Sequence, residues 1–146
     1  MRVATDTATL VVFDPVGLRH RLSASHDWWT WAPTCAEEMN AGNLLAVDLG
    51  ADGVYEVVIH LDVDRPETEN GVVGEIACDS GELFIGPGEQ ITADGLEADE
   101  SLGGIFLPVP EGTYRAHFGR DKDTVEVWLE PVTSSAMNQF SDYLRL

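Results

Sequence analysis

The chain has 146 residues, which fits one domain with a sizeable core and leaves little room for a second. It carries 26 Asp and Glu against 8 Lys and Arg, a net charge of −18. Because binding to nucleic acid or to an anionic membrane depends on Lys and Arg, both are poor direct partners for this chain. No apolar run is long enough to span a membrane, and the N-terminus shows no apolar signal segment, so we expect a cytoplasmic protein.

The negative charge is concentrated in the middle of the chain. Between Leu22 and Tyr114, 8 Asp and 11 Glu stand against one base, Arg65, which gives −18, whereas residues 1–21 sum to +1 and residues 115–146 to −1. This concentration of negative charge has two interpretations. A high charge of one sign keeps a protein dispersed in solution, and it also steers a macromolecule with a basic surface toward the protein.

Short apolar segments that alternate with a period of two, separated by Gly, Pro and Asp turns, predict an antiparallel β protein. Short turns at 50–53, 79–81, 110–112 and 120–123 are typical of β-hairpins, and 87–104 is expected to be a long exposed loop. This spacing predicts a single all-β domain over residues 1–146, an antiparallel β-sandwich or a partly open barrel. The expected strands cover 9–13, 44–49, 55–61, 72–78, 82–86, 105–109, 113–119 and 124–130.

Two short helices and a helical tail complete the prediction. Asp14 and Pro15 favour a helical turn through Leu18. Thr34 and Glu37 form a capping-box pattern for a second helix that ends near residue 41. In the tail, residues 135–146 place apolar side chains at helical spacing, which predicts a helix that docks on an open sheet or binds a partner.

Motifs for catalysis or for metal binding are missing from the sequence. Cys35 and Cys78 are too few for a disulfide framework and read as small buried side chains, and no nucleophile motif or phosphate loop is present. His60 and His117 fall on outward strand positions and could meet near Glu56, either as solvated side chains or as metal ligands. Residues 62–69 alternate acids as a calcium loop does, but an acidic hairpin tip fits them better. We therefore expect no enzyme, no metal and no cofactor.

Three of the four tryptophans lie within four residues, at Trp28, Trp29 and Trp31. Alternation along a strand cannot bury Trp28 and Trp29 on the same face. One interpretation is that they cover an open end of the β domain. The other is that they anchor a binding partner, because Trp buries a large area at low entropic cost, or that they stack on a sugar.

Several patches resemble small bacterial β-sandwich proteins of contact-dependent and secreted-toxin immunity families. These are residues 4–14, the Trp28-Trp29 pair, residues 47–57 and residues 107–115. The run Pro110-Glu111-Gly112-Thr113-Tyr114-Arg115 is also similar to a Pro-x-Gly-x-Tyr-x-Val motif of competence-associated nuclease inhibitors, with Ala116 in place of the valine. The resemblance implies an interaction role and transfers no functional residue.

Together these patterns predict an immunity or antitoxin protein that binds and neutralises a secreted toxin with a basic surface, for example a nuclease. The alternative is a β-sandwich that binds a small molecule, a sugar or a metal. On the first hypothesis the tryptophans anchor the partner and acidic side chains replace phosphates. The candidate contact residues are Trp28, Trp29, Trp31, Asp62, Asp64, Glu67, Glu69, Asp94, Glu97, Asp99 and Glu100.

Overall fold

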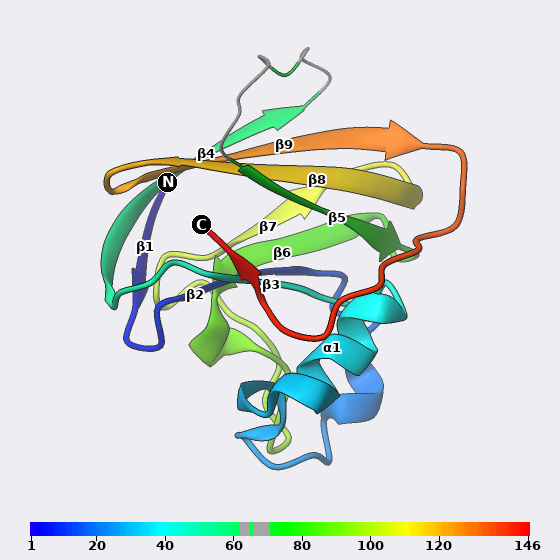
Figure 1. Ribbon diagram of the computed structural model, residues 1–146. Coiled ribbons are helices and arrows are strands. Elements are labelled where there is room, and N and C mark those ends of the chain that lie inside the picture. Colours follow the sequence, from blue (N-terminus) through cyan, green and yellow to red (C-terminus); the bar gives the residue numbers. More distant parts are fainter. Residues whose placement is uncertain (62–64, 66–70) are drawn as a thin grey trace.

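The structure, a computed structural model, describes residues 1–61, 65 and 71–146 (Figure 1). All eight predicted strands are present, with bounds that differ from the prediction by no more than two residues. Two further short strands, β1 and β10, were not predicted. The strands are β1 (Arg2–Thr5), β2 (Thr9–Phe13), β3 (Leu45–Asp48), β4 (Gly53–Leu61), β5 (Gly71–Cys78), β6 (Glu82–Pro87), β7 (Ile105–Pro108), β8 (Gly112–Asp121), β9 (Thr124–Val132) and β10 (Leu144–Arg145).

The strands form two five-stranded sheets, and neither sheet closes into a barrel. The strand order is β1-β4-β9-β8-β5 in one sheet and β10-β3-β2-β6-β7 in the other. Both sheets are mixed, because β4 pairs with β9 in parallel and β10 pairs with β3 in parallel. The expectation of a purely antiparallel protein is therefore wrong. We refer to the sheet that contains β9 as sheet A and to the one that contains β2 as sheet B.

Three of the predicted hairpins are connections between the two sheets. The turns at 50–53, 79–81 and 110–112 join β3 to β4, β5 to β6 and β7 to β8, and each pair is divided between the sheets. Of the four predicted hairpin turns, only the one at 120–123 closes a hairpin, between β8 and β9. Glycine and aspartate at these turns permit a sharp reversal, but they do not determine whether the next strand pairs with the previous one or crosses the core.

Two of these crossings share one local structure. Gly53 and Gly112 both adopt positive φ, at 154° and 150°, a backbone conformation that favours glycine. Two residues later, the hydroxyl of Tyr55 donates to the carbonyl of Ala51 at 2.6 Å, and Tyr114 donates to the carbonyl of Pro110 at 2.7 Å. Each tyrosine thus fixes the chain at the point where it enters sheet A.

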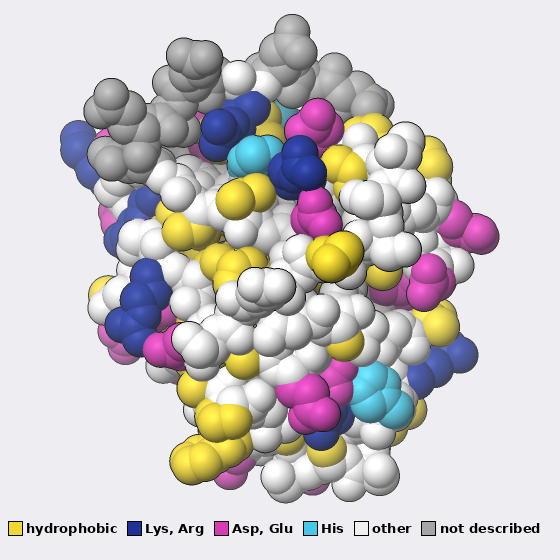
Figure 2. Space-filling model, turned by 45° about the vertical axis from the view of Figure 1, so that its right-hand side comes forward, with side chains coloured by type: hydrophobic (Ala, Val, Ile, Leu, Met, Phe, Trp, Pro, Cys, Tyr) yellow, Lys and Arg dark blue, Asp and Glu magenta, His cyan; other side chains and the backbone are white. Residues whose placement is uncertain are grey.

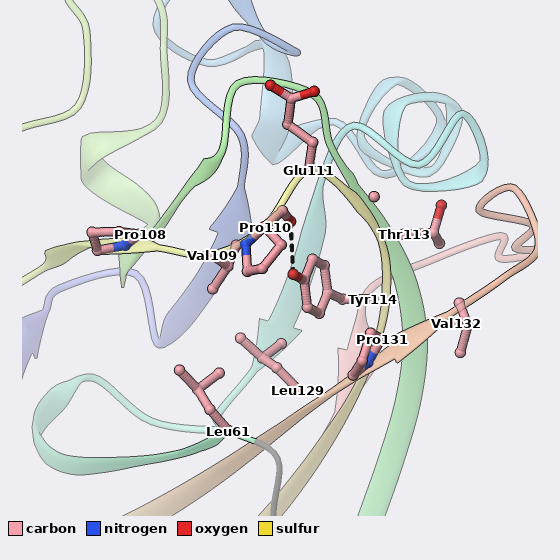
Figure 3. A pocket seen from close by; sticks show the side chains of 11 residues that line it. Leu61, Pro108, Val109, Pro110, Glu111, Thr113, Tyr114, Leu129, Pro131 and Val132 are labelled. Carbon is pink, nitrogen blue, oxygen red and sulfur yellow. Dashed lines mark hydrogen bonds between the residues drawn. The ribbon is translucent and has the colours of Figure 1, made fainter.

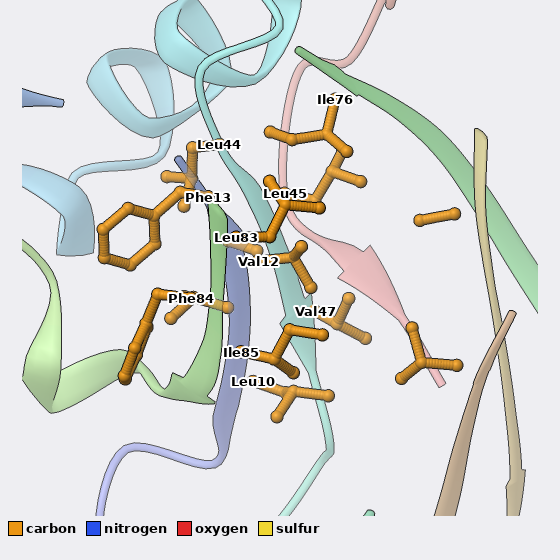
Figure 4. Close-up of a cluster of buried hydrophobic side chains, with 14 of the residues drawn as sticks. Leu10, Val12, Phe13, Leu44, Leu45, Val47, Ile76, Leu83, Phe84 and Ile85 are labelled. Carbon is orange, nitrogen blue, oxygen red and sulfur yellow. The ribbon is translucent and has the colours of Figure 1, made fainter. Parts of the chain in front are cut away.

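Buried side chains pack on both faces of sheet B, between the two sheets and between sheet B and the helical segments (Figure 4). Every residue of β2, the central strand of sheet B, is buried. In sheet A the predicted alternation holds, since Val125, Val127 and Leu129 of β9 point into the core. On the face of sheet B that points away from sheet A, the aromatic rings of Phe13 and Phe84 pack with centroids 5.3 Å apart (Figure 4).

All helical structure in residues 1–61 and 71–146 lies on the side of sheet B that faces away from sheet A (Figure 1). The α-helix α1 (Ala32–Asn40) is preceded by 3₁₀ turns at Arg19–Arg21 and Trp28–Thr30, and a third 3₁₀ turn covers Gly88–Gln90. The helix predicted after Asp14 is a turn, in which the Asp14 carboxylate accepts a hydrogen bond from the Val16 amide. Thr34 does not cap α1, because the helix begins two residues earlier, where Pro33 fits the first turn. No helix in the described ranges reaches the length and apolar character that a membrane crossing requires.

The predicted helical tail is wrong. Residues 133–143 run extended across the molecule and end in β10, which pairs with β3. Hydrogen bonds to distant groups replace those of a helix. The Asn40 side chain donates to the Phe140 carbonyl and accepts from the Phe140 amide, and the Tyr143 hydroxyl donates to the carbonyl of Trp29.

Candidate protein-binding surface

The structure separates the three clustered tryptophans. Trp28 and Trp29 are 6% and 3% exposed and belong to the core. The Trp28 indole donates to the carbonyl of Thr92 at 2.9 Å, and the Trp29 ring lies against the backbone of Gly88, where a β-carbon would stand 2.6 Å from the ring. Trp31, at the start of α1, is 66% exposed. Of the three, only Trp31 is accessible to a partner in this conformation.

The long segment after β6 divides into a buried half and an exposed half. Ile91, Thr92 and Ala93 are buried beneath the 3₁₀ segments, contrary to the expectation of a fully exposed loop. Residues 94–102, which we call the acidic loop, are nearly all exposed and carry Asp94, Glu97, Asp99 and Glu100. Leu96, 65% exposed, lies among these acids.

Hydrogen bonds to the rest of the protein hold the acidic loop in place. The amides of Asp94 and Gly95 donate to the carbonyls of Ala24 and Leu22 at 2.9 and 2.6 Å. At the other end of the loop, the carbonyl of Leu102 accepts from Ala4 of β1 at 3.0 Å. The loop is therefore tied to the body of the protein at both ends.

Two carboxylates of the acidic loop are themselves oriented. Asp94 accepts a hydrogen bond from the amide of His26 at 3.1 Å. Asp99 accepts from the Ser101 amide at 2.7 Å and from the side chain of Gln90. Hydrogen bonds from Ser101, with a smaller contribution from Gln90, hold the pKa of Asp99 below its ordinary value, so this group is ionised at neutral pH.

Little positive charge compensates the acidic loop. Among the described residues, its one ion pair joins Glu97 to Arg19 at 3.9 Å, between two exposed side chains. On the face drawn in Figure 2, acidic and basic side chains are interspersed with hydrophobic ones. The other predicted acidic group, Asp62, Asp64, Glu67 and Glu69, lies outside the described residues.

The outer face of sheet A carries a row of three rings across neighbouring strands. His60 of β4 and His117 of β8 both pair in register with Trp128 of β9, a residue that the sequence analysis did not single out. The His60 and Trp128 rings are stacked, with centroids 4.9 Å apart. The histidines thus lie on one face, as predicted, but Trp128 stands between them.

Glutamates on β9 accompany the two histidines. His60 Nε2 lies 3.6 Å from Glu126, and His117 Nε2 lies 3.9 Å from Glu130. Glu56, the expected neighbour, instead lies 3.4 Å from the N-terminal amine. Burial, together with Arg65 and Arg115, outweighs Glu130 and lowers the pKa of His117, which favours the neutral ring. No group of three or more His, Cys, Asp or Glu within residues 1–61, 65 and 71–146 is arranged to hold a metal ion.

The architecture defines a class of two-sheet proteins with solved members. The structure of ComJ from Bacillus subtilis, described as an inhibitor of the DNA degrading activity of NucA, superposes with a TM-score of 0.58 at 11% identity, over 90% of this chain and 94% of that one. A protein described as Crocagin biosynthetic gene J superposes with a TM-score of 0.50 at 14% identity, over 88% of this chain and 92% of that one. At these identities the likeness concerns the fold.

By sequence, the chain belongs to a family of unknown function, DUF6386, whose profile matches residues 1–146. No curated protein matches the sequence.

Proposed function

We propose that this protein is an inhibitor that binds a nuclease or a similar toxin enzyme in the bacterial cytoplasm, and that the acidic loop forms part of the contact. The observation that carries the proposal is the set of four exposed carboxylates between Asp94 and Glu100, presented on a loop fixed at both ends. A nuclease cleft that receives phosphates attracts such a surface. The fold shared with ComJ, itself an inhibitor of a DNA-degrading enzyme, supports this direction.

The ordered loop favours binding for a second reason. Because hydrogen bonds already hold its backbone and two of its carboxylates, the loop loses little conformational freedom when a partner binds. Leu96, within the acidic loop, and Trp31, at the start of α1, offer exposed apolar area. Exposed charges act mainly on the association rate, whereas buried apolar contacts act mainly on the lifetime of the complex.

The proposal is tested with the enzyme encoded by the reading frame beside the gene for this protein, in stopped-flow association and in a DNA-degradation assay. We expect stoichiometric inhibition. Raising salt from about 0.05 to about 0.5 M should slow association roughly tenfold or more, because the Debye length shrinks from roughly 14 to roughly 4 Å.

Two charge-matched variants separate the acidic loop from net charge. E97K/E100K reverses two acids of the loop, and D121K/D123K reverses two exposed acids at the β8–β9 turn. We expect the loop variant to associate roughly tenfold more slowly than the control at low salt. Equal effects of the two variants would exclude the loop as the contact, and the absence of any inhibition by the wild type would overturn the proposed function itself.

A further inference from the structure

An apolar pocket opens at the crossing from β7 to β8 (Figure 3). It encloses about 210 Å³ between the end of β4, the β7–β8 crossing and β9. Val109, Tyr114 and Leu129 are buried and form its floor. Leu61, Pro110 and Pro131, all exposed, surround the opening.

The pocket is built before any ligand arrives. The Tyr114 hydroxyl donates to the Pro110 carbonyl at 2.7 Å, and the Val109 amide donates to the carbonyl of Gly81 at 3.0 Å. Pro131 pairs in register with Tyr114 across β8 and β9. Proline rings have a fixed φ and few side-chain conformations, so the walls cannot easily collapse. A preformed apolar pocket with a few polar groups at its edge is the usual form of a binding site.

Size and charge together define what the pocket accepts. A cavity of about 150 Å³ lined by aliphatic side chains holds benzene, so this volume accommodates a phenyl or a branched aliphatic group. The exposed carboxylate of Glu111 stands at the edge of the pocket, and none of the described residues that line it is a Lys, Arg or His. A positive charge next to the apolar group would therefore be attracted by the carboxylate of Glu111.

We infer that this pocket receives a hydrophobic side chain of the inhibited enzyme, one that lies beside a lysine or an arginine; this inference rests on the proposed function. In this arrangement the protein contributes the pocket and the enzyme contributes the side chain that fills it. The sequence-based hypothesis had the opposite arrangement, in which tryptophans of this chain are the anchoring side chains. Burial of Trp28 and Trp29 in the core agrees with this exchange of roles.

The first experiment examines the pocket alone, by NMR titration of methyl groups in the purified protein. Phenethylammonium and phenylacetate are the probes, because they carry the same ring with opposite charges. We expect phenethylammonium to shift the methyl signals of Val109, Leu129 and Val132, and phenylacetate to bind several-fold more weakly. Glu111→Gln should reduce the difference between the probes. No shifts at these methyls, or equal binding of both probes to the wild type, would overturn the inference.

The second experiment examines the enzyme. Leu61→Trp places a bulky ring at the opening of the pocket, and Val54→Trp is its control on the same strand, at a position 52% exposed. We expect Leu61→Trp to weaken binding of the enzyme about tenfold or more, mainly through faster dissociation, and Val54→Trp to change it little. Thermal unfolding shows whether both variants remain folded. Phenethylammonium should compete with the enzyme for the wild-type protein.

The outcomes distinguish the two proposals. Inhibition that persists in Leu61→Trp and is insensitive to phenethylammonium would overturn the pocket as the receptor while the proposed function stands. Failure of the wild type to bind the enzyme would overturn the proposed function and the anchor with it, and the titration would still decide whether the pocket accepts an apolar cation.

Discussion

The carboxylate of Glu38 is buried in α1, and three side chains from other parts of the chain contact it. Arg21 and Asn43 donate hydrogen bonds to it at 2.7 and 2.8 Å, and the His20 ring lies 2.6 Å away. Burial raises the pKa of this carboxyl, but the hydrogen bonds from Asn43, His20 and Arg21 outweigh burial and lower the pKa overall. Glu38 thereby joins the 3₁₀ turn at Arg19–Arg21 to α1.

Replacing Glu38 with Gln should lower the free energy of unfolding by about 2 kcal/mol at pH 7, because charge-assisted hydrogen bonds become neutral ones. A depressed pKa in the folded state stabilises the protein above the ordinary carboxyl pKa, and this contribution is lost as the pH falls through the lower folded value. The difference in the free energy of unfolding between wild type and variant should thus shrink as the pH falls through the lowered folded-state pKa of Glu38. Urea denaturation at several pH values measures it.

The matched control is Glu37→Gln, at the neighbouring position. Glu37 is 75% exposed and lies 3.7 Å from the same arginine, Arg21. We expect this change to cost at most about 0.5 kcal/mol. A similar loss of unfolding free energy in both variants would show that burial does not strengthen the contribution of the Glu38 hydrogen bonds to stability.

At the scale of secondary structure, the extended tail protects a free strand edge. β5 lies at the edge of sheet A, and the Asn138 side chain accepts from the Glu75 amide at 2.9 Å and donates to the Glu75 carbonyl at 2.7 Å. The same amide group also donates to the carbonyl of Met39. One residue thus occupies the place that a neighbouring strand would take, which limits pairing with other chains.

Asn138→Ala should expose that edge locally. We expect amide hydrogen exchange at Glu75 to become at least about tenfold faster, because its donor loses its partner. The amide of Ala77, which donates to the carbonyl of Gly42, is an internal control on the same strand and should change little. Unchanged exchange at Glu75 would mean that the edge is protected by packing and not by the Asn138 side chain.

Local patterns predicted the strands but not their neighbours. The alternation of Val125, Val127 and Leu129 is enough to identify β9 and its inward face, because a strand's two faces depend only on sequence spacing. The turns at 50–53 and 79–81 contain residues typical of hairpin turns, yet each connects a strand of one sheet to a strand of the other. Such a choice depends on which distant strand completes each sheet, and a local motif carries no information about it.

The tail and the tryptophans show the same limit. Met137 and Phe140 have helical spacing, but the tail that contains them is extended. Hydrogen bonds hold it so, between Asn40 and Phe140, which are 100 residues apart, and between Asn138 and Glu75. Trp29 is buried because Gly88, distant in sequence, leaves room for its ring. The exposed acids of the acidic loop were identified from composition alone, whereas the pocket beside Glu111 required three separate segments to be brought together.

At the scale of the whole molecule, a net charge of −18 on 146 residues repels itself. Among the described residues, several ion pairs bind acids, including Glu75 with Arg115 at 3.0 Å and Asp142 with Arg145 at 2.9 Å, but there are too few bases to neutralise the excess. Compaction brings these charges closer together than in the unfolded chain, so the repulsion opposes folding.

Salt should therefore stabilise this protein. Raising sodium chloride from about 0.02 to about 0.5 M should increase the thermal unfolding midpoint by roughly several degrees, since screening weakens repulsion between exposed charges. A sugar solution of equal osmolality controls for effects of the solute other than screening. The same salt range should slow association with a basic enzyme, so stability and binding rate should move in opposite directions. A midpoint that stays constant or falls with salt would show that favourable ion pairs outweigh the repulsion.

The order of strands in the two sheets also has a consequence for biosynthesis. β9, the central strand of sheet A, and β10, an edge of sheet B, follow all the other strands in chain order. While these residues remain inside the ribosome, β4 lacks its parallel neighbour and β8 lacks one of its two partners. Sheet A cannot be completed before residues 124–132 are available, nor sheet B before residues 144–145, and such long-range pairing slows folding further. Under the proposed function, a cell would have to make this inhibitor well before the inhibited enzyme becomes active.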